Sequence, residues 1–408
     1  MDKNKRLTVW LPVIIAASIA LGIFIGNHYL SISQGKKRSY SSGNKINAIL
    51  DIIDEQYVDT VSMSKLVEST ISELDPHSVY IPAEDASVVN EELEGSFSGI
   101  GVSFNMQTDT ILVISVISGG PAEKAGLLPF DRIISINDSI FSGKKKNQGE
   151  IMKTLRGAKN STVKLGVQRG NSPELLYFDV TRGDVPVNSV DVSFEAAKGI
   201  GYIKVSKFAR NTYNEFITAI AKLKQAGCTS FVIDLRGNTG GYMDAAINMI
   251  NEFMPEGRLI VYTEGKSFPR SDVYANGTGT CKDAPIVVLT DEISASASEI
   301  FSGAIQDNDR GTIIGRRTYG KGLVQTQMSL SDDSEMRLTI ARYYTPSGRC
   351  IQKKYEMGNT DAYDQDIYNR YMHGEFDSAD SIKMDDSLKY QTVGGRTVYG
   401  GAGYLYPS

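Results

Sequence analysis

The order of apolar and polar residues along the chain separates segments of different character. Residues 7–26, LTVWLPVIIAASIALGIFIG, contain no charged side chain over a length sufficient to cross a bilayer as a helix. Residues 27–43 are polar and rich in Ser and Gly, as expected of a flexible tether. Apolar positions then recur at helical spacing in two short runs before residue 75, which predict a helical segment over residues 44–92. This segment can pack on the rest of the chain or on a second subunit, and the latter would make a homodimer.

Two segments with different sequence patterns follow the helical segment. Residues 93–183 contain short strand-like runs, ILVISVI, DRIISIND and TVKLGVQRG, separated by Gly/Pro turns, and indicate a compact, mainly β module. Residues 184–352 alternate strands with helices, which predicts an α/β unit with largely parallel strands. Residues 353–408 are acidic and rich in Tyr, and are expected to be mainly loop. The strands of the α/β unit are expected at residues 200–205, 229–235, 284–290 and 311–315, and its helices at 212–227, 244–254 and 298–307.

The composition excludes several classes of function. The chain has 408 residues, of which 41% are hydrophobic, enough for two or three globular units. A net charge of −5 without a clustered basic face argues against a nucleic-acid partner. Cys228, Cys281 and Cys350 are far apart and lack metal-ligand spacing, so neither a disulfide framework nor a metal site is predicted. Cys350 is expected to be a small packing residue.

The apolar N-terminal segment predicts a membrane anchor. It is longer than the apolar part of a cleaved signal peptide, and only a weak small-residue site, Ser31 to Ser33, follows it, which favours an uncleaved signal-anchor. Three basic residues in the N-terminal flank, residues 1–6, favour a cytoplasmic N-terminus, although three basic residues at 36–38 nearly cancel that asymmetry. We therefore expect a single pass through the inner or plasma membrane, with the bulk of the chain on the extracytoplasmic, periplasmic side.

Lys321 lies in a Gly-rich stretch, GRRTYGKGLVQ, that partly matches a phosphate-binding P-loop. The spacing of Gly315, Gly320 and Lys321 fits such a loop, but Gly322 stands where Ser or Thr would hold magnesium. The run LVQTQMSL that follows alternates in polarity and predicts a strand instead of the helix that a P-loop needs. A P-loop nucleotide binder is therefore an unlikely alternative, and no cofactor is predicted.

Two other stretches are candidate partners of Lys321. In TDEISASASEIFSGAIQD, Ser296 is expected at the entrance of a helix, where backbone N–H groups can stabilise a developing oxyanion. Ser296 is thus a candidate nucleophile, and a simple helix cap is the alternative. In VIDLRGNTGGYMD, a strand enters a helix through a glycine turn, so that the N–H of Gly240 or Gly241 could donate to an oxyanion. An ordinary strand-to-helix turn is the alternative there.

A serine nucleophile needs a base beside it. The three histidines, His28, His77 and His373, all lie outside the predicted α/β unit, so a Ser-His-Asp triad is improbable. A buried lysine can replace histidine, because burial disfavours its charged form and leaves a neutral amine. Lys321 fits this role, and Gln325 would share its strand face and orient the amine.

Several ordered motifs resemble those of the carboxy-terminal processing peptidases, which are serine endopeptidases with a Ser-Lys dyad. SASASE and YGKGLVQ carry the resemblance, and DLRGNTGG, TPSGRCIQ and LDPHSVYI are similar to further segments of that family. The resemblance implies an α/β protein with a crotonase-like catalytic core, an inserted mainly β PDZ domain and an N-terminal helical segment. It also implies a reaction that uses neither metal nor nucleotide.

The resemblance assigns roles to individual residues. It implies that Ser296 is the nucleophile, Lys321 the general base and Gln325 the residue that positions the base. It places the oxyanion hole at the backbone N–H groups of Ala297 and of one of the two glycines, Gly240 or Gly241. Glu299 matches a family position near the dyad, and its role stays open.

The β module resembles the PDZ domain that these peptidases carry before the catalytic core. GSFSGIGVSF and SGGPAEKAGLLPFDRIISIND carry this likeness. The N–H groups of Gly99, Ile100, Gly101 and Val102 can hold a chain-end carboxylate while a peptide adds as a β-strand, and a plain surface turn is the alternative. In the family this domain recognises apolar C-terminal tails of proteins and can gate access to the dyad.

The chain departs from the family after TPSGR. Family members usually follow this segment closely with a strand that completes the core, whereas residues 353–393 intervene here. A non-catalytic PDZ adaptor or an inactive peptidase is therefore the alternative function.

Overall fold

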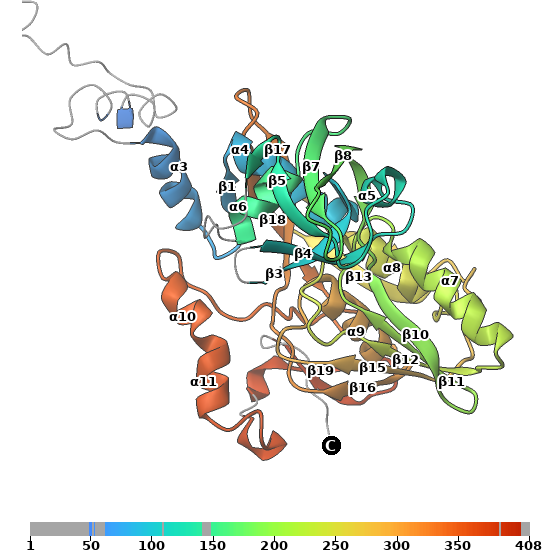
Figure 1. The fold of residues 1–408 in the computed structure, drawn as a ribbon. Coiled ribbons are helices and arrows are strands. Elements are labelled where there is room, and N and C mark those ends of the chain that lie inside the picture. The colour runs from blue at the N-terminus through green and yellow to red at the C-terminus, as the bar shows by residue number, and fades with distance from the viewer. Residues whose placement is uncertain are drawn as a thin grey trace, which may run out of the picture. The chain divides into compact units, whose positions relative to one another are not determined.

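The computed structural model describes residues 49–50, 53, 62–107, 110–140, 148–382 and 385–400 (Figure 1). Contacts divide the chain into two units, Met1–Leu66 and Val67–Ser408. The predicted membrane anchor and tether lie outside the described residues. Within the part that the structure describes, every helix is too short or too polar to cross a bilayer.

Helix α3 (Met63–Ser72) confirms the second of the two predicted N-terminal helices. The first falls almost wholly outside the described residues. Strand β1 (Val79–Ile81) and helix α4 (Ala83–Glu94) follow, and α4 ends at Gly95, whose φ of +75° is readily adopted by glycine.

A five-stranded sheet in the order β10-β11-β12-β15-β16 forms the centre of the second unit. Strands β11 to β16 run parallel and β10 is antiparallel to β11, which confirms the predicted α/β unit. Helices α7, α8 and α9 pack against the sheet (Figure 1). Four buried phenylalanine rings make edge-to-face contacts in this core: Phe216, Phe231, Phe253 and Phe301. The elements are β10 (Val190–Ala197), β11 (Ile200–Val205), α7 (Thr212–Gln225), β12 (Ser230–Asp234), α8 (Met243–Asn251), β15 (Ile286–Thr290), α9 (Ala297–Asp307) and β16 (Thr312–Gly315).

A second, antiparallel sheet was not predicted. Its strand order is β1-β18-β13-β14. Strand β17 also pairs with β18, antiparallel to it along residues 335–342. Because β1 precedes the β module in sequence and pairs with β18, the module is inserted into the α/β unit. Strand β17 (Leu323–Ser329) confirms the strand predicted after Lys321, whereas β13 (Leu259–Glu264), β14 (Ser271–Tyr274) and β18 (Glu335–Tyr344) were not predicted.

The inserted β module has its own sheet, β3-β4-β5-β7-β8, with the short β6 paired to β5. Its core is separate from that of the α/β unit and is built from buried aliphatic side chains such as Ile111, Val113, Ile133, Val163 and Leu165. Strands β2 and β9 pair with each other where the chain enters and leaves the module. The elements are β2 (Ser96–Gly99), β3 (Val102–Gln107), β4 (Thr110–Val116), α5 (Pro121–Ala125), β5 (Arg132–Ile136), β6 (Ser139–Ile140), α6 (Gln148–Leu155), β7 (Thr162–Gln168), β8 (Leu176–Thr181) and β9 (Gly183–Pro186).

The C-terminal segment is more ordered than the sequence analysis expects. It contains two short helices because Tyr363 and Arg370 are buried, which gives this charged stretch apolar and hydrogen-bonding anchors. Arg349, fully buried, donates to Asp307 at 2.6 Å and to the carbonyl of Tyr399 at 2.9 Å, and so ties the end of α9 to the last hairpin. The elements are α10 (Thr360–Asp364), α11 (Asp366–Met372), η1 (Ala379–Ser381), η2 (Asp386–Leu388), β19 (Lys389–Gln391) and β20 (Thr397–Tyr399).

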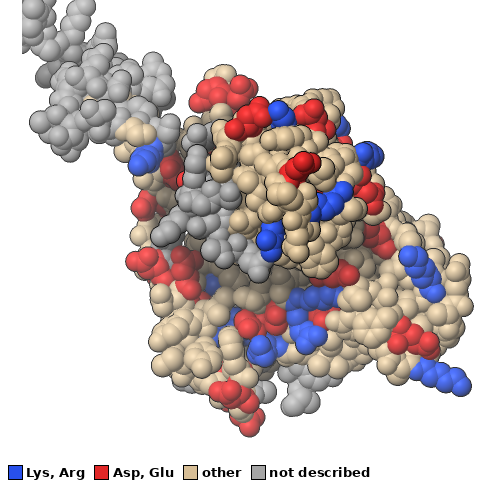
Figure 2. Space-filling view, in the orientation of Figure 1, with Lys and Arg blue, Asp and Glu red and all other residues tan. Residues whose placement is uncertain are grey.

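Charged side chains of both signs are interspersed over the face of the molecule in Figure 2, and the Lys and Arg groups there are accompanied by Asp and Glu. The three cysteines are free, with Cys228 and Cys281 buried and Cys350 partly buried.

Candidate active site

Two turns at the carboxyl ends of the parallel strands β12 and β15 lie against each other, and Ser296 lies at the end of the second. The N–H of Ala295 donates to the carbonyl of Asn238 at 3.0 Å, and the hydroxyl of Ser294 donates to the carbonyl of Leu235 at 2.8 Å. The carboxyl edge of a parallel sheet is where open α/β folds place their ligand sites.

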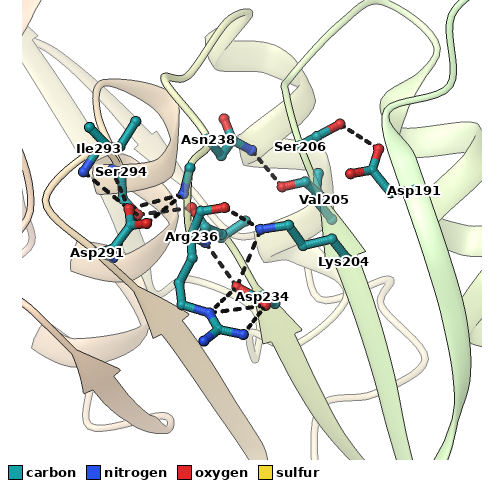
Figure 3. A network of polar contacts seen from close by, with 12 residues as sticks. Asp191, Lys204, Val205, Ser206, Asp234, Arg236, Asn238, Asp291, Ile293 and Ser294 are labelled. Atoms are coloured by element: carbon teal, nitrogen blue, oxygen red, sulfur yellow. Dashed lines mark hydrogen bonds and ion pairs between the residues drawn. The ribbon is translucent and has the colours of Figure 1, made fainter.

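A polar network around the buried side chains of Asp234 and Asn238 fixes the first of these turns (Figure 3). The carboxylate of Asp291 accepts the N–H of Gly237, and the side chain of Asn238 donates to the carbonyl of Val205 at 3.0 Å. Burial of Asp234 opposes its ionisation, but hydrogen bonds from Arg236 and other donors lower its pKa to about 2. The turn after β12 is therefore held from both of its neighbouring strands.

Ser296 has an unusual backbone conformation at the entrance of α9. Its φ of 53° and ψ of −112° lie in a region that non-glycine residues rarely adopt, and such outliers cluster at functional sites. It occupies the N-cap position of α9, so the predicted helix entrance is confirmed.

The glycine turn after β12 packs directly on Ser296. A Cβ added to Gly240 would lie 2.8 Å from Cβ of Ser296 and 3.1 Å from the nitrogen of Ala297, and one added to Gly241 would lie 2.1 Å from the carbonyl oxygen of Phe208. Both glycines also have positive φ, +105° and +135°, so no other residue fits there without strain.

The N–H groups of this turn differ in their availability. The N–H of Gly240 donates to the side-chain oxygen of Asn238 at 2.8 Å. The N–H groups of Gly241 and Ala297 have no acceptor among the residues that the structure describes. An anion beside Ser296 could therefore take hydrogen bonds from Gly241 and Ala297.

Lys321 is mostly buried, and its side chain meets an amide instead of a carboxylate. Its Nζ donates to Oε1 of Gln325 at 3.1 Å, and the side-chain nitrogen of Gln325 donates to the carbonyl of His77. Burial is the main cause that lowers the pKa of Lys321, and the charge of Arg337 lowers it further. The neutral amine is thereby favoured.

Glu299 links the backbones of Ser296 and Lys321. Its fully buried carboxylate accepts the N–H of Ser296 at 2.9 Å and the N–H of Lys321 at 2.8 Å. It also accepts the hydroxyl of Thr318 at 2.6 Å and the N–H of Gly320 at 2.8 Å. Burial raises the pKa of Glu299, and these four hydrogen bonds oppose that rise.

Tyr343 in β18 forms a second link that the sequence analysis missed. Its hydroxyl lies 3.1 Å from the carbonyl oxygen of Ser296 and also contacts the carbonyl oxygen of Lys321. Tyr343 sits within an ordinary strand sequence, EMRLTIARYY, which carries no signal for this role.

One cavity of about 790 Å³ brings the predicted site residues together. Glu299 lies behind its wall and Ala297 is buried next to Ser296. Its lining includes Ser296, Lys321, Gln325, Gly240 and Gly241.

The β module carries a second cavity of about 220 Å³, between the edge strand β3 and helix α6. Ile100, Gly101 and Val102 line it, whereas Gly99 pairs with Gly183 in the β2–β9 ladder. The carbonyls of Ile100 and Gly101 are bonded to Ala122 and Ile117, and in the described part of the chain their N–H groups have no acceptor. Phe97, Met152, Leu155 and Phe104 supply apolar walls.

Neither a metal site nor a P-loop is apparent at the site. The described residues contain no cluster of three or more His, Cys, Asp or Glu side chains that could hold a metal ion. Strand β17 follows Lys321, as predicted, so the helix N-terminus that a P-loop uses is not there.

Comparisons with known proteins point to one family. The model of peptidase family S41 matches residues 199–361, and the PDZ domain model matches residues 98–191. The carboxy-terminal processing protease CtpB of Bacillus subtilis (strain 168) is 34% identical over 318 residues, which are 76% of this chain and 66% of that protein. A probable CtpA-like serine protease of Staphylococcus aureus (strain N315) is 32% identical over 365 residues, 86% of this chain and 72% of that protein.

Among solved structures, a photosystem II D1 C-terminal processing protease overlays with a TM-score of 0.45 at 26% identity, covering 76% of this chain and 84% of that one. The family assignment rests on the sequence comparisons, which span both the β module and the α/β unit. The chain therefore belongs to peptidase family S41, the carboxy-terminal processing serine proteases, and carries a PDZ domain ahead of its peptidase core.

Proposed function

We propose that this chain is a membrane-anchored endopeptidase that cleaves proteins with apolar C-terminal tails by means of a Ser296–Lys321 dyad. The observation that carries the proposal is the shared clamp: Glu299 binds the backbones of both residues, and both side chains line one cavity. The buried position of Lys321 favours the neutral amine that a general base requires.

The proposed reaction begins with proton transfer from Oγ of Ser296 to Nζ of Lys321. Oγ attacks the carbon of the scissile carbonyl. The carbonyl oxygen becomes negative and accepts hydrogen bonds from the backbone N–H groups of Ala297 and Gly241. Gly241 is favoured over Gly240 because the N–H of Gly240 is already bonded to Asn238. The protonated lysine then gives its proton to the departing amine, which leaves an acyl-enzyme. A water molecule that transfers a proton to Lys321 hydrolyses the acyl-enzyme.

The PDZ domain supplies the proposed substrate recognition. The edge strand β3 can pair with an added peptide strand. The N–H groups of Ile100 and Gly101, which no described residue accepts, suit a terminal carboxylate. Apolar side chains around the same cavity suit an apolar tail.

The alternative is a PDZ adaptor or an inactive peptidase without a working core. The bond between Arg349 and the carbonyl of Tyr399 supports an intact core, because it seats the last hairpin on α9 despite the intervening segment 353–393.

The first prediction concerns the nucleophile. Ser296→Ala should reduce proteolysis of an unfolded protein with an apolar C-terminus on the order of 10³-fold or more, because no other hydroxyl would replace Oγ. It should also abolish labelling by a fluorophosphonate, while Ser329→Ala, at an exposed position in β17, should label like the native protein. Equal labelling of native protein and Ser296→Ala would remove Ser296 from its role and favour the adaptor.

The second prediction concerns the lysine and pH. In the folded protein the pKa of Lys321 is lowered, so kcat/KM should rise with pH through that pKa. At pH values between the lowered pKa of Lys321 in the folded protein and the ordinary pKa of lysine, the unfolded chain binds more protons than the folded chain. The free energy of unfolding therefore rises with pH in that window because of this residue.

Lys321→Met should therefore abolish proteolysis and yet stabilise the fold at neutral pH. The gain in the free energy of unfolding should shrink as the pH approaches the pKa of free lysine, about 10.4. Urea unfolding at about pH 7 and about pH 10 measures this, together with a pH–rate profile of the native protein. A flat profile, or a variant that is less stable at neutral pH, would contradict a buried lysine base.

The third prediction concerns the tail of the substrate. A fluorescent peptide with an apolar C-terminus and a free carboxylate should bind Ser296→Ala about tenfold or more tightly than the same peptide with an amidated end. The loss of charge-assisted hydrogen bonds to the loop of Ile100 and Gly101 causes the difference. Equal affinity of the two peptides would show that this loop does not read the carboxylate.

The fourth prediction concerns the proposed anchor, whose support is the apolar sequence of residues 7–26. The full chain should sediment with membranes and resist extraction by salt, and deletion of residues 7–26 should release it. Protease added to intact spheroplasts should digest the peptidase core. Protection of the core until the membrane is lysed would place it on the cytoplasmic side. A homodimer through residues 44–92 stays a prediction.

A further inference from the structure

The segment that follows the family match reaches the back of the active site. The S41 model matches up to residue 361, and Tyr363 in α10 lies just beyond it. Tyr363 is buried, with 3% of its surface exposed, although the segment around it is acidic and mostly exposed. It does not line the cavity that contains Ser296 and Lys321, so it can act on the site only through other residues.

The hydroxyl of Tyr363 contacts two side chains that lead to Lys321. It lies 2.8 Å from Nε2 of His77, and the side-chain nitrogen of Gln352 donates to it at 3.4 Å. Because the hydroxyl accepts from Gln352, it can donate its own proton to Nε2 of His77, and it also has a hydrogen-bond contact with Tyr319. Burial lowers the pKa of His77 to about 4, so near neutral pH its ring is uncharged and can accept that proton.

His77 and Gln352 in turn hydrogen-bond to residues beside Lys321. The carbonyl of His77 accepts the side-chain nitrogen of Gln325, whose oxygen accepts Nζ of Lys321 at 3.1 Å. The side-chain oxygen of Gln352 accepts the N–H of Gly322, the next residue after the lysine, at 2.8 Å. The hydroxyl of Tyr363 is thus connected to both sides of Lys321.

The same C-terminal segment holds the loop that precedes Lys321. The N–H of Lys353 donates to the carbonyl of Gly320 at 2.9 Å, and Arg370 in α11 donates to the carbonyl of Thr318 at 3.1 Å. Nζ of Lys353 lies 4.1 Å from the ring centroid of Tyr319 and 3.9 Å from that of Tyr363. Residues 318–320, which lead into Lys321, are therefore held by this C-terminal segment.

We propose that Tyr363 is a positioning residue that holds Gln325 where it can orient the amine of Lys321. This inference rests on the proposed Ser-Lys chemistry and adds a residue to it from outside the region that the family model matches. The second anchor of His77 is Asp75, whose carboxylate accepts the N–H of His77 at 2.8 Å. Asp75 holds the turn through the backbone N–H of His77 and Tyr363 holds it through the ring, so the position of the His77 carbonyl that binds Gln325 depends on both.

The test replaces the hydroxyl alone. Tyr363→Phe keeps the buried ring and its contact with Lys353, so the fold should persist in circular dichroism and thermal unfolding. With the hydroxyl gone, His77 and Gln325 are less constrained, and Nζ of Lys321 can move further into the cavity and be hydrated there. We expect kcat to fall on the order of tenfold with KM unchanged, since Tyr363 lies outside the cavity. Tyr368→Phe, at an exposed position in α11, is the matched control and should behave like the native protein.

The pH profile separates positioning from general destabilisation. The acidic limb of kcat/KM should move to higher pH in Tyr363→Phe, because hydration of the amine relieves the burial that lowers the pKa of Lys321. The other charged groups that bear on this amine stay in place and are unchanged by the substitution: Arg337 in β18, Asp75 before β1, Glu299 in α9, and, through His77, Lys353.

A double-mutant cycle then tests the route. In a Gln325→Ala background, Tyr363→Phe should add little further loss, because the residue through which it acts is gone. Additive losses, or a native kcat and pH profile in Tyr363→Phe, would overturn the proposal. If Tyr363→Phe does not fold, His77→Phe removes the acceptor from the other end and must give the same shift of the acidic limb. Ser296→Ala distinguishes the two levels: activity retained there would reject the dyad itself, whereas activity lost there with a native Tyr363→Phe would reject only this inference.

Discussion

The active-site geometry depends on the buried carboxylate of Glu299. Removing a carboxylate from water is costly unless every acceptor position is filled, and here four donors from two chain segments fill them. Two of these donors are the backbone N–H groups of Ser296 and Lys321. The same bonds that compensate the burial of Glu299 therefore fix the two proposed catalytic residues relative to each other. A carboxamide could not substitute, because its NH₂ group would face backbone donors.

The hydrogen bonds of Glu299 help to maintain an unfavourable backbone conformation at Ser296. The positive φ of Ser296 costs free energy, and it persists because the surroundings over-determine it. Glu299 holds its N–H, Tyr343 contacts its carbonyl, and Gly240 leaves room for its Cβ. In the same place the N–H groups of Gly241 and Ala297, which have no acceptor within the described ranges, point to an anion site. Strain and unsatisfied donors coincide where the proposed oxyanion would form.

Local sequence patterns predicted the helices and strands of the α/β unit, but not all of the strand pairs and tertiary contacts that they form. The apolar runs of β11, β12, β15 and β16 are typical of buried parallel strands, and the structure confirms them. Strand β17 of the antiparallel sheet was predicted, but the sheet itself was not, because the pairs that assemble it join distant segments, as when Val79 pairs with Arg337 and Tyr262 with Tyr344. Motifs identified Ser296 and Lys321 as candidates, whereas Tyr343 and Tyr363 carry no local signal. Their roles come from tertiary contacts with backbone carbonyls and with His77.

Two buried lysines near the site show how the surroundings decide which of them can act as a base. Burial lowers the pKa of both Lys321 and Lys353. Lys353 is surrounded by groups that favour the ammonium: the carboxylate of Asp366 at 3.3 Å, the carbonyl of Tyr363 at 3.1 Å and two aromatic faces. Lys321 has the neutral amide oxygen of Gln325 as its hydrogen-bond acceptor, and a positive charge on Arg337 acts against its protonation. The lysine that faces the cavity thus lacks the carboxylate partner that its neighbour has, and only the more distant charges of Asp75 and Glu299 oppose the lowering of its pKa.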